Sequence, residues 1–295
     1  MSIFKNKDIK PMLLTETSKP FNDKNYIFEL KFDGIRTLIY ISKNNIIIKS
    51  RNQLILNDLF PELLDIKNNF KTNIIFDGEI VVLKDGKPSF SSLQKRLHIK
   101  DKNKINKLKK EYPATFICFD ILYETKDLTN LKLIKRKEIL NKYKDTKEFI
   151  KTIYYKENGI NLFNAVKEMN LEGIVAKNIN STYQINTRSN DWIKIKNLKD
   201  DDFYICGYLE KENVASLLLG EKKDNKYIYV GKVTIGKKRN EFRIIKKCKI
   251  TKNNLTNFND KNYIFINPSI KCTVNFLERT NNNSLRHPVF KCLKM

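Results

Sequence analysis

A lysine, Lys31, stands two residues before an Asp-Gly turn in the segment LKFDGIR, residues 30–36. Apolar, β-rich runs flank this segment at residues 26–30 and 37–41, so Lys31 should end one strand and Arg36 should begin the next. A lysine amine can attack a phosphorus centre when its surroundings keep it deprotonated. The segment therefore suggests covalent nucleotide chemistry on Lys31.

Five further segments carry charged or aromatic side chains on or beside predicted strands. They are Ser50-Arg51, Asp77-Gly78-Glu79, FICFD (116–120), EGIVAK (172–177) and WIKIK (192–196). Because side chains alternate along a strand, Asp77 and Glu79 should share one face of their strand, and Lys194 and Lys196 one face of theirs. Carboxylates suit a hard cation, and clustered cations suit phosphate.

The elements that must position these residues are a mixture of strands and helices. Short β-type runs recur at 46–48, 74–83, 115–123 and 174–177, and helices are expected near 57–68, 90–97, 133–143 and 160–169. The lysine-rich run 100–110 predicts an exposed loop or a short helix. Since no regular βαβ rhythm is present, we expect an α+β domain.

A second domain is expected after Lys196, where the polar stretch 197–202 is typical of a hinge. Strands are predicted at 203–209, 214–219, 226–233 and 269–277, with a helix around 237–246. Four or five strands with one helix suit a small closed barrel such as an OB-fold. We therefore predict two domains, residues 1–197 and 198–295.

Composition points to a polyanionic partner. The 295 residues include 57 Lys and Arg against 33 Asp and Glu, a net charge of +24 that favours nucleic acid, although any single lysine could belong to a solvated surface. Five scattered cysteines and two histidines argue against a zinc site or a disulfide framework. Because no run approaches the roughly 18 apolar residues of a membrane helix, and no signal peptide begins the chain, we expect a cytosolic protein without membrane contact.

The six motifs, in this order, resemble the nucleotidyltransferase motifs of ATP-dependent DNA ligases, which mRNA capping enzymes and some RNA ligases share. Four other segments resemble the ligase module of bacterial end-joining enzymes of the ligase D type. These are PMLL (11–14), PSFSSLQKRL (88–97), FLERT (276–280) and LRHPVF (285–290). The resemblance implies an α+β nucleotidyltransferase domain, ATP-grasp-like, followed by a small OB-fold β-barrel domain.

The resemblance also implies a three-step reaction with ATP as the cofactor. Lys31 attacks the α-phosphate to give lysyl-AMP, AMP moves to the 5′-phosphate of a DNA nick, and the 3′-hydroxyl displaces AMP. Lys194 and Lys196 are the other expected catalytic residues, as contacts of the α-phosphate and as cations that help to keep Lys31 deprotonated.

By motif match, further residues are assigned to the nucleotide, the metal and DNA. The nucleotide-binding residues are Arg36, Arg51, Glu79, Phe119, Lys177 and Glu172. Glu172 and Glu79 are expected to hold Mg²⁺ or Mn²⁺, and Arg36, Arg51 and Arg286 to contact DNA. For Asp33 and Asp77 a turn or orienting role is an equal alternative, while Phe116 and Trp192 are expected in the core.

The C-terminus departs from the family pattern, because Cys292 and Lys294 stand where Gly and Arg are expected. A lysine can meet phosphate only as a point charge. The resemblance implies nicked duplex DNA as partner, a monomer acting in repair, recombination or end joining in the bacterial cytosol, and a Ku-type end-binding protein. Two alternatives remain open: an RNA ligase or capping-type nucleotidyltransferase, and a non-catalytic basic nucleic-acid-binding protein.

Overall fold

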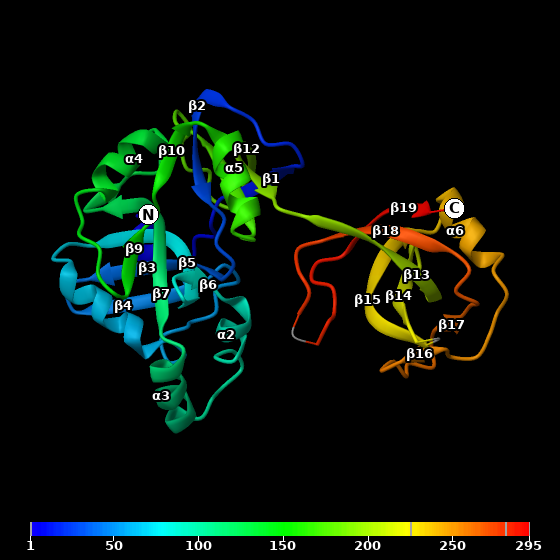
Figure 1. Cartoon of the computed structure of the whole chain (residues 1–295). Helices are drawn as coiled ribbons and strands as arrows, with labels where there is room; N and C mark the ends of the chain where they lie inside the picture. The colour runs from blue at the N-terminus through cyan, green and yellow to red at the C-terminus, as the bar shows by residue number, and fades with distance from the viewer. Residues whose placement is uncertain (1, 225, 281, 295) are drawn as a thin grey trace. The chain divides into compact units, whose positions relative to one another are not determined.

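The computed structural model describes residues 2–224, 226–280 and 282–294. The chain divides into two units, residues 1–197 with two sheets and residues 198–295 with one, and each unit has its own buried core (Figure 1).

The first sheet of residues 1–197 has five strands. In order across the sheet they are β1 (Leu13–Thr17), β12 (Arg188–Lys196), β11 (Gly173–Asn178), β2 (Asp23–Leu30) and β10 (Tyr154–Glu157). β1 runs parallel to β12, and the other neighbours are antiparallel. One face of this sheet is apolar: Phe28, Ile174 and Ile195 pack against Phe163 and Val166 of α5 (Gly159–Glu168).

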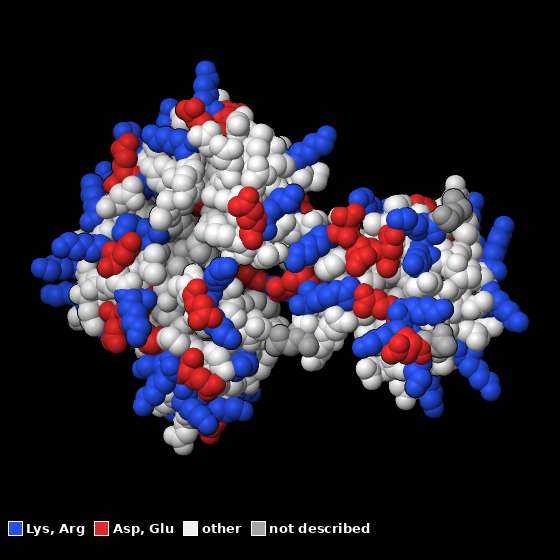
Figure 2. All heavy atoms as spheres, in the orientation of Figure 1, with Lys and Arg blue, Asp and Glu red and all other residues white. Residues whose placement is uncertain are grey.

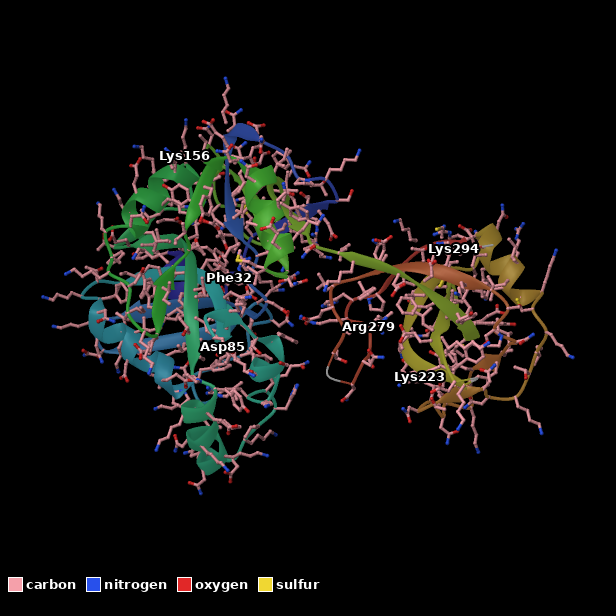
Figure 3. The ribbon with its side chains drawn as sticks, viewed as in Figure 1. Phe32, Asp85, Lys156, Lys223, Arg279 and Lys294 are labelled. Carbon is pink, nitrogen blue, oxygen red and sulfur yellow. The ribbon has the colours of Figure 1, made fainter. Side chains whose placement is uncertain are left out.

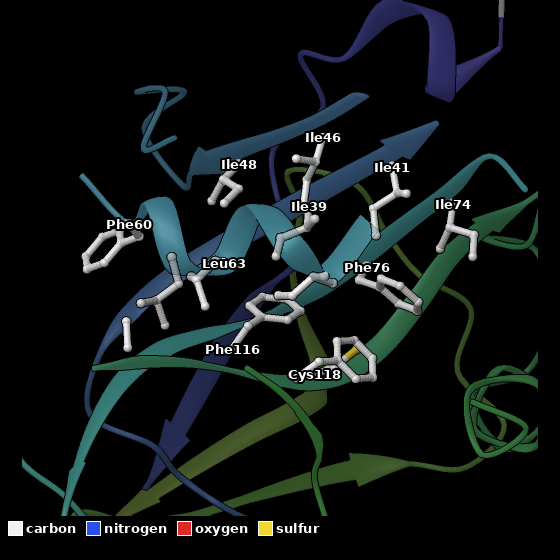
Figure 4. Packing of buried hydrophobic residues seen from close by; sticks show 14 of the residues in the cluster. Ile39, Ile41, Ile46, Ile48, Phe60, Leu63, Ile74, Phe76, Phe116 and Cys118 are labelled. Atoms are coloured by element: carbon white, nitrogen blue, oxygen red, sulfur yellow. The ribbon is translucent and has the colours of Figure 1, made fainter. Parts of the chain in front are cut away.

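The second sheet of this unit is built around two long, buried strands. Its strands are β4 (Asn45–Ser50), β3 (Ile35–Ser42), β5 (Ile74–Lys84), β7 (Ala114–Glu124) and β8 (Lys126–Asp127), with β6 (Lys87–Pro88) beside β5 and β9 (Phe149–Lys151) beside β7. Ile39, Ile41, Phe76 and Phe116 fill its outer core, which η1 (Pro61–Asn69) covers (Figure 4). Phe116 is fully buried, as predicted.

The inner faces of the two sheets meet in a second core. Leu38, Tyr40 and Ile75 of one sheet pack with Ile27 and the fully buried Trp192 of the other, which confirms the core position predicted for Trp192. Alternate residues of a strand share one face. Further along these same faces the apolar side chains give way to charged ones, and these charged residues form the site described below.

The remaining helices of this unit are α1 (Ile3–Asn6), α2 (Phe90–Gln94), α3 (Lys102–Glu111) and α4 (Leu133–Leu140). The helices predicted near 90–97, 133–143 and 160–169 are confirmed, and the lysine-rich run forms α3. The helical stretch predicted near 57–68 is the 3₁₀-helix η1, which begins later than expected, at Pro61. Proline fixes φ and lacks an N–H donor, so it can start a helix but cannot continue one.

Residues 198–295 form a small β domain of the expected OB-fold-like kind. In order across the sheet, its strands are β16 (Leu255–Thr256), β15 (Lys226–Gly236), β14 (Val214–Lys223), β13 (Lys199–Glu210), β18 (Lys271–Phe276) and β19 (Val289–Lys294), with β17 (Ile264–Phe265) beside β13. β19 also contacts β15, so the sheet curls around a core to which α6 (Asn240–Lys246) contributes Phe242 and Ile245.

The hinge predicted at 197–202 is wrong for its acidic part. Residues 199–202 are the first residues of β13 and pair with β18. Asp200 and Asp202 form ion pairs with Lys291 (3.2 Å) and Lys294 (2.6 Å) of β19. Tertiary pairing thus overrides the weak strand propensity of aspartate. Among the described residues, every helix is too short or too polar to cross a bilayer.

Candidate active site

A cavity of about 240 Å³ in the unit of residues 1–197 is lined by residues of both sheets. Figure 3 labels Phe32, one of these residues. The cavity brings together most of the residues that the sequence predicted for the site. Those that line it are Lys31, Arg36, Arg51, Glu79, Phe119, Lys177 and Lys194.

Strand register explains why these residues meet. On β11, Val175 has Glu29 of β2 on one side and Lys194 of β12 on the other. Two residues earlier on β11, Gly173 pairs with Lys196 of β12, and its carbonyl oxygen accepts a hydrogen bond from the backbone N–H of Lys31 at 2.9 Å. Neighbouring strands lie about 4.8 Å apart, so two parallel rows of charged side chains point to the same face.

Lys31 lies beside a carboxylate. Its Nζ is 2.7 Å from Oε1 of Glu172, and both side chains are largely buried. Lys194 and Lys196 instead share Glu16, each with its Nζ 3.1 Å from that carboxylate. The structure therefore gives Lys31 an anionic partner and keeps the other two lysines together on a second anion.

Glu16 was not anticipated from the sequence. It lies on β1 directly opposite Lys194 in the parallel register. Partial burial raises its pKa, but hydrogen bonds from Lys194 and Lys196 outweigh this effect and hold the pKa below its usual value. Its only signal in the sequence is its place just after the PMLL segment, on a strand that the sequence reading did not assign.

The Arg36 guanidinium is bound by the Asp77 carboxylate. Its Nε and Nη2 donate to Oδ1 and Oδ2 of Asp77, both at 2.6 Å, and the Tyr183 hydroxyl donates to Oδ2 at 2.6 Å. Burial lowers the pKa of Arg36, but the Asp77 carboxylate more than compensates and raises it above its ordinary value. Asp77 thus orients a neighbour, one of the two roles considered for it.

Glu79 faces Arg36 across the β3–β5 pair. Burial raises its pKa to about 8, with a further rise from Glu172 and Asp77, although Arg36 and Lys31 lower it. At neutral pH this carboxyl therefore holds a proton unless another cation arrives. Lys31, whose Nζ lies 2.7 Å from Glu172, and Glu172 itself thus have opposite effects on the pKa of Glu79.

The carboxyl pair fits Mg²⁺ but does not form a complete cage. No group of three or more His, Cys, Asp or Glu side chains in metal-binding reach exists among the described residues. Mg²⁺ usually takes one or two carboxylates and fills its other positions with water and phosphate oxygens. Glu79 and Glu172 are the residues that would supply such a set.

The other end of the cavity combines aromatic rings with buried charge. Lys177 Nζ lies 4.2 Å from the ring centre of Phe119 and 2.6 Å from Oε2 of Glu29. Burial lowers the pKa of Lys177 to about 8, against the opposing effect of Glu29. Arg36 also lies over Phe119, at 4.4 Å, so a base that stacks on this ring must share it with a cation.

Glu29 and Lys137 were also missed by the sequence reading. Both are almost fully buried, and Lys137 of α4 donates to Glu29 and, at 3.2 Å, to Thr152. Glu29 could have been found, because it lies two residues before Lys31 and therefore on the same strand face. Lys137 could not, because 108 residues separate it from Glu29.

Two motif glycines are required by close packing. A Cβ on Gly34 would lie 2.2 Å from the Ile80 carbonyl oxygen and 2.9 Å from Cγ of Glu79. A Cβ on Gly78 would lie 2.4 Å from the Ile117 carbonyl oxygen. The Asp-Gly and Asp-Gly-Glu motifs therefore let neighbouring strands approach closely at the site.

Arg51 lines the cavity from an exposed position, whereas Arg286, Lys294 and Cys292 are not among the described residues that line it. Arg51 is exposed, and its backbone N–H donates to the Arg36 carbonyl at 2.9 Å. Arg286 and Lys294 belong to the unit of residues 198–295, where they pair with Glu278 (3.0 Å) and Asp202 (2.6 Å). Cys292 is exposed on β19.

The fold and the cavity are those of a nucleotidyltransferase domain followed by a small β domain. Comparison with known families identifies which one: the ATP dependent DNA ligase domain matches residues 11–196, and the ATP dependent DNA ligase C terminal region matches residues 210–295. The chain belongs to the ATP-dependent DNA ligase family, and it is a ligase. The family predicted from the sequence is therefore confirmed.

Individual relatives agree with this assignment. The SPbeta prophage-derived DNA ligase-like protein LigB of Bacillus subtilis is 32% identical over 286 residues, which cover 96% of this chain and 98% of that protein. The multifunctional non-homologous end joining protein LigD of Mycolicibacterium smegmatis is 28% identical, and the match covers 98% of this chain but 38% of LigD. The solved mycobacterial DNA ligase D complexed with ATP and MES shares the fold, with a TM-score of 0.61, 22% identity and coverage of 97% and 95% of the two chains.

Proposed function

We propose that the chain seals nicks with 5′-phosphate and 3′-hydroxyl ends in duplex DNA through a lysyl-AMP intermediate on Lys31. The observation that carries this proposal is the geometry around Lys31. This lysine directly follows β2 and lines a cavity with Arg36, Glu79 and Lys177, and its Nζ lies 2.7 Å from Glu172. Phosphoryl transfer needs positioning and cationic stabilisation more than other chemistry.

In the first step, Lys31 Nζ forms a bond to the α-phosphorus of ATP while the bond to pyrophosphate breaks. Nζ must first give up a proton, and Oε1 of Glu172 lies within reach of it. Lys194 and Lys196, now 3.1 Å from Glu16, would exchange that carboxylate for α-phosphate oxygens. Mg²⁺ held by Glu79 and Glu172 would supply further neutralisation of phosphate charge.

The nucleoside would occupy the aromatic end of the cavity. Adenine would stack on Phe119, beside Lys177 and the buried Glu29. Phe119 is only 8% exposed, with Arg36 and Lys177 over its ring, so a base that stacks there would have to displace one of these cations. In this proposal, residues of both sheets would contact the nucleoside and select it.

The later steps involve DNA. We assign the 5′-phosphate of the nick to the exposed Arg51, whose guanidinium can form two parallel bonds to phosphate, and to the donors of Arg36 that Asp77 does not occupy. The 3′-hydroxyl would then displace AMP and join the strands. We further propose residues 1–197 as the adenylation domain and residues 198–295 as the OB-fold domain, with Arg286 a backbone contact and Lys294 a point charge for the pyrophosphate.

For the pathway, we propose repair or end joining by a monomer in the bacterial cytosol, with a Ku-type protein as partner. The support is the name of the mycobacterial relative, which describes non-homologous end joining. Joining of linear DNA ends with and without a bacterial Ku protein tests this. A Ku-independent rate would contradict the partnership without affecting nick sealing.

The central experiment combines labelled ATP, Mg²⁺ and a duplex with one 5′-phosphorylated nick. We expect AMP on Lys31 and a sealed strand. Lys31→Ala should lose adenylation yet still join a preadenylated nick slowly. Lys24→Ala, an exposed lysine on the same strand, is the matched control and should behave like the wild type. Labelling by GTP alone, or sealing of nicked RNA but not nicked DNA, would refute the proposal.

A further inference from the structure

The lysine-rich run of residues 100–111 has no part in the site described above. Six lysines and two acids give it a net charge of +4, one sixth of the +24 of the whole chain, in twelve residues. It forms α3, whose N-cap is Asp101: the Asp101 side chain accepts the Lys104 N–H at 2.7 Å. One of the two acids is therefore occupied in capping the helix.

The lysines of α3 are on its exposed surface. Ile105 is buried and Leu108 is half-buried, and Lys107 and Lys110 are exposed on the side of the helix opposite these two residues. Lys102 and Lys104 are exposed on the two flanks of the apolar side. Asn103 and Asn106 lie among these lysines, so ammonium and amide donors alternate along the face. Figure 2 shows Lys and Arg side chains crowded over the end of the unit where Figure 1 places α3.

Helix stability does not explain this pattern. Lys104 and Lys107, and Lys107 and Lys110, are three residues apart, where like charges repel and destabilise a helix. Among the ion pairs between described residues, none includes these lysines. The face therefore carries unneutralised positive charge that a polyanion would relieve.

The position of α3 suits DNA held at the cavity. Ala114, three residues after the end of α3, pairs with Val82 of β5, and Val82 lies three residues from Glu79. At about 3.3 Å per strand residue, Val82 is roughly 10 Å along the strand from Glu79, and α3 ends a short step before the residue that pairs with Val82. The span from Lys102 to Lys110 is about 12 Å, against a phosphate every 3.4 Å or so along one DNA strand.

We propose that the exposed face of α3 binds the phosphate backbone of the duplex within a few base pairs of the nick. The inference rests on the proposed nick-sealing function. Because lysines contact phosphates as point charges, the contact is independent of sequence and sensitive to salt.

The test is a charge-removing variant with Lys102, Lys104, Lys107 and Lys110 all changed to Gln. Its affinity for nicked duplex should fall at least tenfold at about 0.1 M salt, and the slope of log K against log salt should become shallower by about 2 to 4. The matched control changes four exposed lysines elsewhere on the same unit to Gln, and its slope should change by less than 1. These are Lys43, Lys71, Lys142 and Lys144.

Two further measurements distinguish loss of the proposed DNA contact from misfolding of the variant and from failure of the proposed nick-sealing function. Adenylation of Lys31 by ATP without DNA should be unchanged in the variant, whereas failure of the wild type to adenylate would instead refute the proposed function. In the wild type, nicked duplex should protect Lys104, Lys107 and Lys110 from amine-reactive labelling, but not Lys142. Equal binding by variant and control, or absence of this protection, would overturn the proposal.

Discussion

Glu79→Gln should stabilise the unit of residues 1–197 while abolishing adenylation. In the folded chain, burial raises the pKa of Glu79 from 4.5 to about 8. Between these two values the unfolded chain has lost the Glu79 proton and the folded chain keeps it. The contribution of Glu79 to stability is therefore complete below about pH 4.5 and is lost as pH rises to 8.

The size of the effect follows from the same numbers. A shift from 4.5 to about 8 corresponds to at most about 4.8 kcal/mol, and water at the cavity mouth reduces this. We expect Glu79→Gln to gain about 1 to 2 kcal/mol at pH 8 and close to zero at pH 5. For a unit of this size the gain at pH 8 is a rise in Tm of about 2 to 8 °C.

The assay is thermal unfolding without nucleotide or metal at pH 5 and pH 8, beside ATP labelling of Lys31. The control is Glu62→Gln, because the buried Glu62 accepts from Arg96 at 2.6 Å and from the Ala114 N–H at 2.9 Å. Removing the Glu62 charge leaves the buried Arg96 guanidinium without an anionic partner. The free energy of unfolding should therefore fall by about 3 kcal/mol at both pH values. The reasoning fails if Glu79→Gln lowers Tm at pH 8, or if its gain is the same at pH 5.

Three other substitutions separate the roles of the charged residues. Asp77→Asn removes the bidentate partner of Arg36 and should cost about 3 kcal/mol in unfolding and weaken nick binding; a variant as stable as the wild type would contradict this. Lys137→Met should destabilise the fold by about 3 kcal/mol and raise the KM for ATP, since Glu29 loses a buried partner; an unchanged KM would limit Lys137 to a structural role. Lys294→Ala should slow lysyl-AMP formation and leave the sealing of a preadenylated nick unchanged, as single-turnover rates would show; equal slowing of both steps would contradict the pyrophosphate role.

The structure also changes the view of how Lys31 becomes reactive. The sequence suggested that Lys194 and Lys196 act as its cationic neighbours, whereas their ammonium groups are held by Glu16 and Lys31 is held by Glu172. In the proposed reaction, ATP would rearrange both sets of ion pairs. Lys31 is thus ion-paired with Glu172 before the reaction.

The sequence by itself determined the family and the strand faces that carry the motifs. Alternation along one strand is a local property, so it could place Asp77 with Glu79, and Lys194 with Lys196, before any fold was known. It also predicted the mixed first unit and the small β domain, because hydrophobic periodicity and turn residues mark elements locally.

Only the tertiary structure decided which charges are neighbours. Asp77 meets Arg36 and Tyr183 across 41 and 106 residues of chain, and Lys137 meets Glu29 across 108. Such pairs depend on strand register and helix docking, which set distances of a few ångströms that no local pattern specifies. The same pairs decide charge states in the site, because burial and neighbouring charge, rather than residue type, move a pKa.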